Sequence, residues 1–150
     1  MVYTSFDELI AKQKAAPRAA RMAVAAAGAE HTVEAVLHAR REGIVRPVLV
    51  GGRAAIADAL AHFGETVPDE DIYDVPDAAE AARVAVSLVR DGRADFLMKG
   101  KLDTSVMLRP VVNKETGLGR GGVMSHFTIF QIPGYHKLLG VADGGMIPAP

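Results

Sequence analysis

Six residues whose types suit anion binding lie close together in the chain: Lys99, Gly100, Lys101, Thr104, Ser105 and Arg109. They follow an apolar run expected to be a buried strand, and they open what is expected to be a helix. A helix N-terminus presents unpaired backbone N–H groups and a partial positive charge, which suit a bound anion. Arg109 lies one turn after Ser105, and a guanidinium matches a phosphate or carboxylate well. The pattern predicts a site for a phosphorylated or otherwise anionic small molecule.

The same segment also has a purely structural interpretation. Asp103, Thr104 and Ser105 are residue types that commonly cap helices, and lysines are usually solvated. Pro110 either kinks the expected helix or ends it early. The residues alone therefore leave anion binding and simple capping open.

A glycine-rich segment, Gly117–Gly122, matches the letters of a dinucleotide-binding motif. That motif needs a strand before it and a helix after it. Here the expected order is helix, glycines, strand, so we interpret the segment as a mobile connection or a close backbone approach to a ligand.

The histidines give no metal-ligand spacing, and no metal site is predicted. His126 follows Ser125 at the start of an expected strand, where it is either a general base or a hydrogen-bonded structural residue. Asp143 ends the last expected strand, where it either faces a ligand or caps a turn. Solvated helix positions are expected for His31, His38 and His62.

Composition limits the classes of function. The chain has 150 residues, 23% of them charged, and a formal net charge of −1, so no overall field favours nucleic acid or an anionic membrane. The absence of cysteine excludes disulfides, thiolate metal sites and a thiol nucleophile. No apolar run approaches transmembrane length, and the N-terminal pattern is not that of a signal peptide. We expect a cytoplasmic protein.

Apolar periodicity predicts alternating strands and helices and therefore a three-layer α/β/α domain with a mostly parallel sheet. Two later strand-like runs, Val123–Ile132 and His136–Val141, predict an antiparallel hairpin and hence a mixed sheet. The segment Gly144–Pro150 is expected to be a loop, and residues 1–150 a single domain. Helices are expected at 7–16, capped by Ser5 and Glu8, and at 31–42, 56–63, 78–89 and after 103, and strands at 22–27, 47–51, 71–75 and 94–98.

Several of these motifs resemble the phosphate acetyl/butyryltransferase family. Met98–Gly100, Asp103–Ser105 and Leu108–Arg109 resemble its central motif. The likeness runs through nearly the whole chain and implies the fold of the isocitrate and isopropylmalate dehydrogenases. Further matching segments are Ala23–Ala27, Ile44–Gly51, Asn113–Leu118, Ser125–His126, Phe130–Tyr135 and Leu138–Met146.

The resemblance implies transfer of an acyl group between coenzyme A and inorganic phosphate, with both as substrates and no further cofactor. The butyryl branch is favoured, because an E-L-R-K-x-K-G-like element of acetyl-preferring members is missing between Tyr73 and Pro76. Arg109 matches the family's phosphate-binding arginine, which Thr104, Ser105 and the Gly100 backbone would assist. Possible substrate-binding residues are Lys99, Ser125, His126 and Asp143.

Members of this family are much longer than this chain, which resembles the N-terminal half of a two-domain enzyme. The second half supplies a Ser-Arg pair and an aspartate proposed to deprotonate the coenzyme A thiol. A smaller departure is Ile147-Pro148, where many members carry an asparagine-containing segment. The isolated chain is therefore expected to be inactive, whether it is a truncated or a naturally short product, and to form a homo-oligomer.

Two other functions remain open at this point. The chain could be a non-catalytic domain that binds an anion or acyl phosphate and regulates or docks to a partner. It could also be another enzyme of the same architecture, such as an isocitrate-type dehydrogenase or an acyl-carrier-protein:phosphate acyltransferase. That third possibility needs a carboxylate metal cluster or a nucleotide motif, and the sequence shows neither.

Overall fold

The computed structural model describes residues 2–122 and 124–143. They form two compact units. The sheet unit is Arg18–Gly119, and the hairpin unit combines the described residues before Arg18 with those after Gly119. The segment Gly144–Pro150, expected to be a loop, lies outside the described residues, as does the Ile147-Pro148 departure.

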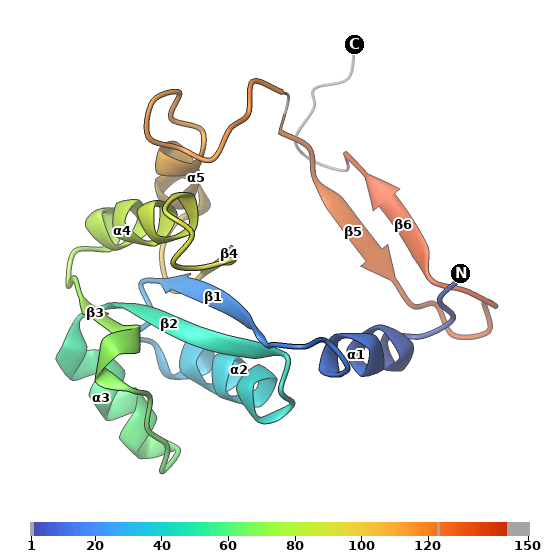
Figure 1. Cartoon of the computed structure of the whole chain (residues 1–150), viewed down its shortest axis with the longest axis horizontal. Coiled ribbons are helices and arrows are strands. Elements are labelled where there is room, and N and C mark those ends of the chain that lie inside the picture. Colours follow the sequence, from blue (N-terminus) through green and yellow to red (C-terminus); the bar gives the residue numbers. More distant parts are fainter. Residues whose placement is uncertain (1, 123, 144–150) are drawn as a thin grey trace. The chain divides into compact units, whose positions relative to one another are not determined.

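The sheet unit is built on four parallel strands in the order β3-β2-β1-β4 (Figure 1). In the centre, Ala23 pairs with Val48 on one side and with Leu97 on the other. A central parallel strand is covered on both faces, which explains the continuous apolar run at the end of β1. The strands are β1 (Ala20–Ala25), β2 (Val45–Gly51), β3 (Ile72–Asp74) and β4 (Phe96–Lys99).

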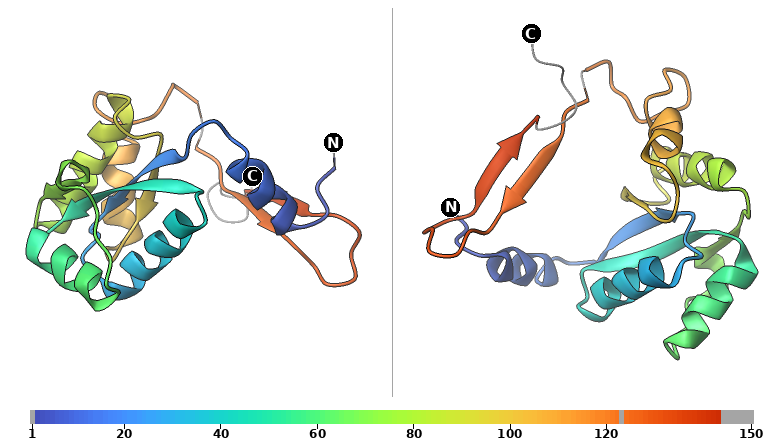
Figure 2. Two further views of the ribbon diagram at one scale, coloured as in Figure 1. Left: turned by 60° about the horizontal axis from the view of Figure 1, so that its bottom comes forward. Right: turned by 180° about the vertical axis from the view of Figure 1, so that it is seen from behind.

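Helices cover both faces of this sheet, and Figures 1 and 2 show α2 and α3 on one side with α4 and α5 on the other. Val24 and Leu49 pack with α2 and α3, whereas Ala23 and Val48 pack with α4. This alternation follows from the period of two along a strand. The predicted three-layer α/β/α arrangement is confirmed. The helices are α2 (Glu30–Arg41), α3 (Arg53–His62), α4 (Ala78–Arg90) and α5 (Thr104–Val111), and a 3-10 turn, Asp69–Asp71, precedes β3.

The strand β4 differs from its prediction as a buried strand. It is an edge strand, and Phe96 is 40% exposed. Among the described residues β4 pairs with β1 alone, and the run of apolar residues in the sequence does not distinguish such an edge strand from a central one.

The hairpin unit contains β5 (Phe127–Phe130) and β6 (Leu139–Ala142), which pair antiparallel as predicted. They form a sheet of their own, so the expectation of one mixed sheet is wrong. The connection is longer than predicted and contains a turn in which the Tyr135 N–H donates to the Ile132 carbonyl at 3.0 Å. Gly134 has φ +83°, and Pro133 precedes it, which is the residue pattern of a type II turn.

The helix α1 (Phe6–Lys14) has the predicted N-cap, with the Ser5 hydroxyl accepting from the Glu8 N–H at 3.3 Å, and it begins one residue earlier and ends two residues earlier than predicted. The reciprocal bond of the expected capping box is displaced by one residue. The Glu8 carboxylate accepts from the Thr4 N–H at 2.9 Å and from the Thr4 hydroxyl at 2.6 Å. These bonds lower the pKa of Glu8, the hydroxyl bond most.

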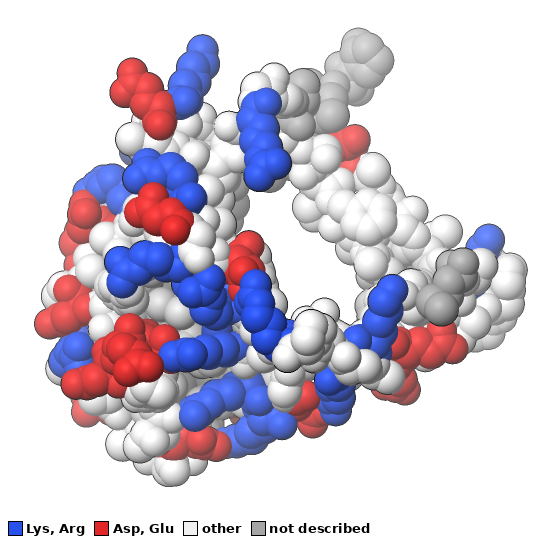
Figure 3. Space-filling view, in the orientation of Figure 1, with Lys and Arg blue, Asp and Glu red and all other residues white. Residues whose placement is uncertain are grey.

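The surfaces of the two units differ in character. In Figure 3, basic and acidic residues lie side by side over the sheet unit, whereas the strands of the hairpin show a continuous uncharged surface. Phe127 is 64% exposed, and two strands alone are marginally stable in water. Within the described residues, no helix is long and apolar enough to cross a membrane.

Candidate functional site

The carboxyl edge of the parallel sheet is the place where this architecture binds ligands. The chain leaves β1 toward β2, later returns on the other side of β1 as β4, and so makes the loops after β1 and β4 diverge. Ligands of open α/β sheets bind in the crevice at such a switch point. The anion-binding segment predicted from the sequence begins at the end of β4.

Gly100 brings this segment against the end of β1. Its N–H donates to the Ala25 carbonyl at 2.8 Å, and the Lys101 N–H donates to the Ala26 carbonyl at 3.2 Å. A Cβ atom on Gly100 would overlap both carbonyl oxygens, so only glycine permits this approach. Since the Gly100 N–H is already paired, its contribution to an anion site would be the position of the loop.

Thr104 and Ser105 form the first turn of α5, and both are exposed. The preceding Asp103 side chain accepts no hydrogen bond from the helix. The Val106 N–H donates to the Asp103 carbonyl at 3.1 Å, whereas the N–H groups of Thr104 and Ser105 have no partner within their own helix. Two hydroxyls and these N–H groups are therefore available to an anion in one turn.

Arg109 lies on the last turn of the same helix and is exposed. Across residues 2–122 and 124–143 its guanidinium makes no hydrogen bond or ion pair. Side chains of a helix tilt toward its N-terminus, and four residues rise about 6 Å, so Arg109 and Ser105 share a face. The structure thus brings Thr104, Ser105 and Arg109 together on one short helix.

The two lysines of the segment do different things. The Lys99 ammonium donates to the Leu102 carbonyl at 2.8 Å and so ties the loop to itself. Lys101 lines a groove of about 360 Å³ at the carboxyl edge. The sequence places both lysines in the predicted anion-binding segment, and the structure shows that their surroundings differ.

This carboxyl-edge groove is lined mostly by glycine and alanine. Gly28 and Gly52 follow the ends of β1 and β2, and a Cβ on Gly28 would come within 2.9 Å of the Ala55 side chain. Ala26 holds a left-handed backbone with φ 55°, a conformation that is strained for a residue with a side chain. The glycines that end apolar runs could have indicated the groove. Its lining is Ala26, Gly28, Ala29, Gly51, Gly52, Ala55, Pro76, Ala78 and Lys101.

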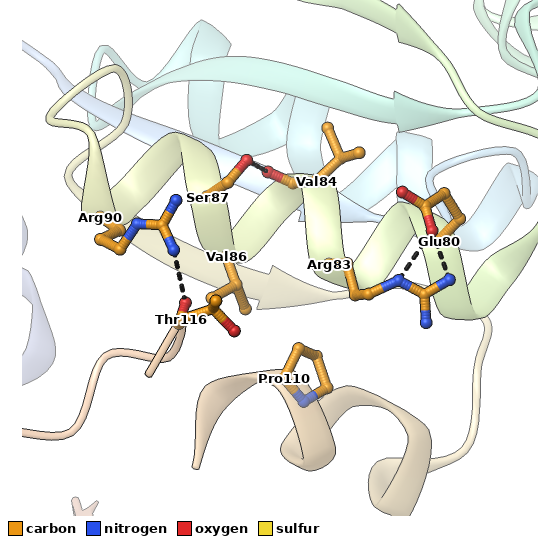
Figure 4. Close-up of a pocket in the computed structure, with 8 residues that line it drawn as sticks. All are labelled: Glu80, Arg83, Val84, Val86, Ser87, Arg90, Pro110 and Thr116. Atoms are coloured by element: carbon orange, nitrogen blue, oxygen red, sulfur yellow. Dashed lines mark hydrogen bonds and ion pairs between the residues drawn. The ribbon is translucent and has the colours of Figure 1, made fainter. Parts of the chain in front are cut away.

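A second groove, of about 270 Å³, lies where α5 is held against α4 (Figure 4). Pro110 points from α5 toward α4, and the Arg90 guanidinium donates to the Thr116 carbonyl at 3.0 Å. The helix continues through Pro110 and ends at Val111. These contacts fix the helix that carries Arg109.

Gly117 completes the turn after α5. Its N–H donates to the Asn113 carbonyl at 3.0 Å, and a Cβ there would overlap the carbonyls of Val111 and Asn113. The glycine-rich segment therefore begins with a close backbone approach, to the end of α5 itself. The interpretation as a dinucleotide motif is not needed to explain this glycine.

Ser125, His126 and Asp143 belong to the hairpin unit. The Asp143 carboxylate accepts from the His126 N–H at 3.3 Å, and the Asp143 N–H donates to the His126 carbonyl at 2.6 Å. The His126 ring nitrogen Nε2 is 3.3 Å from the Thr128 hydroxyl. Asp143 has φ 61°, which places strain beside these polar groups. His126 and Asp143 thus lie together at the end of the hairpin.

Three of the other histidines occupy the solvated helix positions predicted for them. His31, His38 and His62 are exposed. Within the described ranges, no group of three or more histidine or carboxylate side chains could hold a metal ion.

Comparisons with known proteins identify relatives of the chain. The sequence pattern of the family described as phosphate acetyl/butaryl transferase matches residues 70–150. The phosphate butyryltransferase of Clostridium beijerinckii is 38% identical over 97% of this chain and 48% of its own length. That of Clostridium acetobutylicum is 40% identical over 93% of this chain and 46% of its own length. The chain spans about half the length of the curated relatives it matches.

Two solved structures share the α/β fold of this chain. A branched-chain phosphotransacylase from Enterococcus faecalis aligns with a TM-score of 0.59 at 20% identity, over 85% of this chain and 43% of that one. A phosphotransacetylase from Streptococcus pyogenes aligns with a TM-score of 0.59 at 16% identity, over 75% of this chain and 42% of that one.

Proposed function

The chain belongs to the phosphate acetyl/butaryl transferase family, and from this membership we propose that it is the N-terminal half of a two-domain enzyme that transfers an acyl group between acyl-coenzyme A and inorganic phosphate. A butyryl-like acyl group is the preferred substrate in this proposal. Its support is the identity of 38% and 40% to two phosphate butyryltransferases, against 35% to the phosphate acetyltransferase of Thermotoga maritima.

The first turn of α5, together with Arg109, is the observation that carries the proposal. It offers two exposed hydroxyls, uncapped N–H groups and a guanidinium without a partner among the described residues. Phosphate carries negative charge and accepts several hydrogen bonds, so this donor set is complementary to it.

In the proposed reaction a phosphate oxygen attacks the thioester carbonyl carbon. The C–S bond then breaks, the acyl group stays on phosphate, and coenzyme A leaves as a thiolate that takes up a proton. Arg109, Thr104 and Ser105 would hold the phosphate and reduce its charge repulsion with the developing oxyanion. Lys101 would bring a further positive charge to the carboxyl-edge groove, which has room for part of the thioester substrate.

Residues of the hairpin unit and of the other half of the enzyme complete the proposed site. Ser125, His126 and Asp143 are proposed substrate-binding residues, and the catalytic groups that act on the thiol are assigned to the other half of the enzyme. Acyl-coenzyme A and inorganic phosphate are the only small molecules required, without a cofactor. The working form in this proposal is a homo-oligomer. Its location is the cytoplasm, and a chain without cysteine is compatible with that reducing compartment.

A chimera tests this function directly. Residues 1–150 replace the corresponding half of the Clostridium beijerinckii phosphate butyryltransferase, and butyryl-coenzyme A and phosphate are supplied with a chromogenic thiol reagent. The proposal expects phosphate-dependent thiol release by the chimera and none by residues 1–150 alone. A folded chimera that binds phosphate without releasing thiol would instead favour a non-catalytic binding domain. Turnover by the isolated chain would show that the catalytic groups lie within it.

A further inference from the structure

Three arginines line a polar pocket at the amino end of the parallel sheet, on the face covered by α4. The pocket has a volume of about 200 Å³ and is formed by Arg21, Arg46 and Arg93 with Val48, Glu70, Asp71 and Tyr73. Arg21 and Ala25 are four residues apart on β1, so about 13 Å of strand separates this pocket from the carboxyl edge. It is distinct from the groove that contains Lys101.

The strand register forces two of these charges together. Arg21 and Arg46 are direct partners in the β1–β2 pairing, and they lie on the same face as Ala23 and Val48. Like charges at neighbouring positions of a sheet are destabilising. Such an arrangement needs negative charge nearby, from the protein or from a ligand.

Carboxylates of the described residues neutralise Arg46 more fully than Arg21. Arg46 donates to the Asp71 carboxylate at 2.9 and 3.2 Å and to Glu70 at 3.2 Å, and these contacts, with Asp71 first, raise its pKa. Among the described residues, the Arg21 guanidinium has one acidic partner, Asp95, whose carboxylate oxygen lies 3.9 Å from the Arg21 Nε. That carboxylate is already held by two bonds from Arg18, at 2.7 and 2.9 Å.

Arg93 has no carboxylate partner in the part of the chain that the structure describes. Its guanidinium donates to the Tyr73 hydroxyl and lies 5.3 Å from the centre of the Tyr73 ring. Arg21 donates to the Gly92 carbonyl. A guanidinium carries five N–H donors, so each arginine keeps donors for a further acceptor.

We propose that this pocket is a second anion site, which binds one phosphate-type group between Arg21 and Arg93. Arginine is the side chain best suited to phosphate, and Tyr73 holds Arg93 in place for it. A volume of about 200 Å³ lies below the range that holds drug-sized ligands, so coenzyme A is too large. Inorganic phosphate and the phosphate of a small phosphomonoester share the required chemistry.

The test is a titration of the chain, followed by two-dimensional NMR of its backbone amides at constant ionic strength. Inorganic phosphate is expected to shift the amides of Arg21 and Gly92–Arg93 with a saturable curve. Arg93→Gln should weaken this response at least tenfold. Arg83→Gln, which removes an exposed arginine paired with Glu80 on α4, should leave it unchanged.

One further variant and two other anions separate this pocket from the proposed site at the carboxyl edge and from nonspecific anion binding. Arg109→Gln removes the proposed site at the carboxyl edge, so a response that survives this change belongs to the second site even if the proposed function fails. Methyl phosphate in place of phosphate distinguishes the two sources, since equal binding indicates a phosphomonoester and lost binding indicates free phosphate. An equal response to chloride, no saturable shift at these amides, or an unchanged response in folded Arg93→Gln would overturn the proposal.

Discussion

Arg109 gives the sharpest test at the scale of single residues. In the chimera, Arg109→Ala should reduce the apparent affinity for phosphate about ten- to a hundredfold, because a hydrogen bond to a charged group contributes roughly 1.5–3 kcal/mol. Arg109→Lys should restore only part of it, since an ammonium cannot make the two-pronged contact. Steady-state kinetics with phosphate varied at saturating butyryl-coenzyme A measure the effect.

Arg41→Ala on α2 is the matched control, because it removes an exposed arginine, paired with Glu65, on the face of the sheet opposite α5 (Figure 1). A melting curve for each variant separates lost binding from lost folding. If Arg109→Ala leaves the phosphate dependence intact, Arg109 is only a surface residue beside a helix cap.

Asp95 predicts a pH dependence of stability. The Arg18 guanidinium and, after it, the Arg21 backbone N–H hold the pKa of Asp95 well below its usual 3.8. The folded state therefore binds this proton more weakly than the unfolded chain does. The contribution to stability is complete above the ordinary pKa and is lost as the pH falls toward the folded-state pKa.

Asp95→Asn should accordingly be less stable than the original chain at pH 7, and the difference should shrink between about pH 4 and pH 2. Urea unfolding at several pH values measures it. Asp58→Asn, an exposed change on α3, serves as the control. A constant difference down to the lowest pH would contradict the assignment.

At the scale of elements, the junction of β1, β4 and α5 depends on Gly100. Gly100→Ala should destabilise the chain by about 1–3 kcal/mol, because its Cβ would overlap the carbonyls of Ala25 and Ala26. Gly119→Ala is the matched control, since nothing lies within 4 Å of a Cβ there. Chemical denaturation of both variants checks the difference, and equal stability would show that the loop can move away at little cost.

The elements also show what the sequence could predict. The sheet unit's strands and helices follow from local periodicity, and the α/β order predicted the parallel sheet. Register and edges depend on neighbours distant in sequence, which explains the error at β4, where Phe96 is exposed. The same reason applies to the hairpin, whose strands pair with each other and not with the described strands of the parallel sheet.

The candidate site stays a prediction, but the structure shows which of its residues lie on the same element. Thr104, Ser105 and Arg109 share one helix because their spacing is local. The groove that Lys101 lines was not predicted, because it is assembled from the ends of all four strands of the parallel sheet, and no local pattern marks such a convergence.

At the scale of the whole molecule, the hairpin predicts self-association. Phe130 pairs with Leu139 on one face and Phe127 lies on the other, and all three are exposed. Large exposed apolar patches promote association. We expect a dimer or larger species by light scattering, and a shift toward monomer in the double variant Phe130→Ser, Leu139→Ser.

Val112→Ser, which changes an exposed apolar residue of the sheet unit, should leave the mass unchanged. A monomeric original chain at high concentration would refute the prediction.

The order of the strands has a consequence for synthesis on the ribosome. The strands β1, β2 and β3 emerge in sequence, and β2 pairs with one edge of β1. The other edge of β1 pairs with β4, where Leu97 is the partner of Ala23. The helices α2, α3 and α4 are all synthesised before β4. Until then the central strand of the finished sheet is an open edge, and open apolar edges recruit foreign strands. A nascent chain that stalls after β3 would therefore be the form most dependent on chaperones.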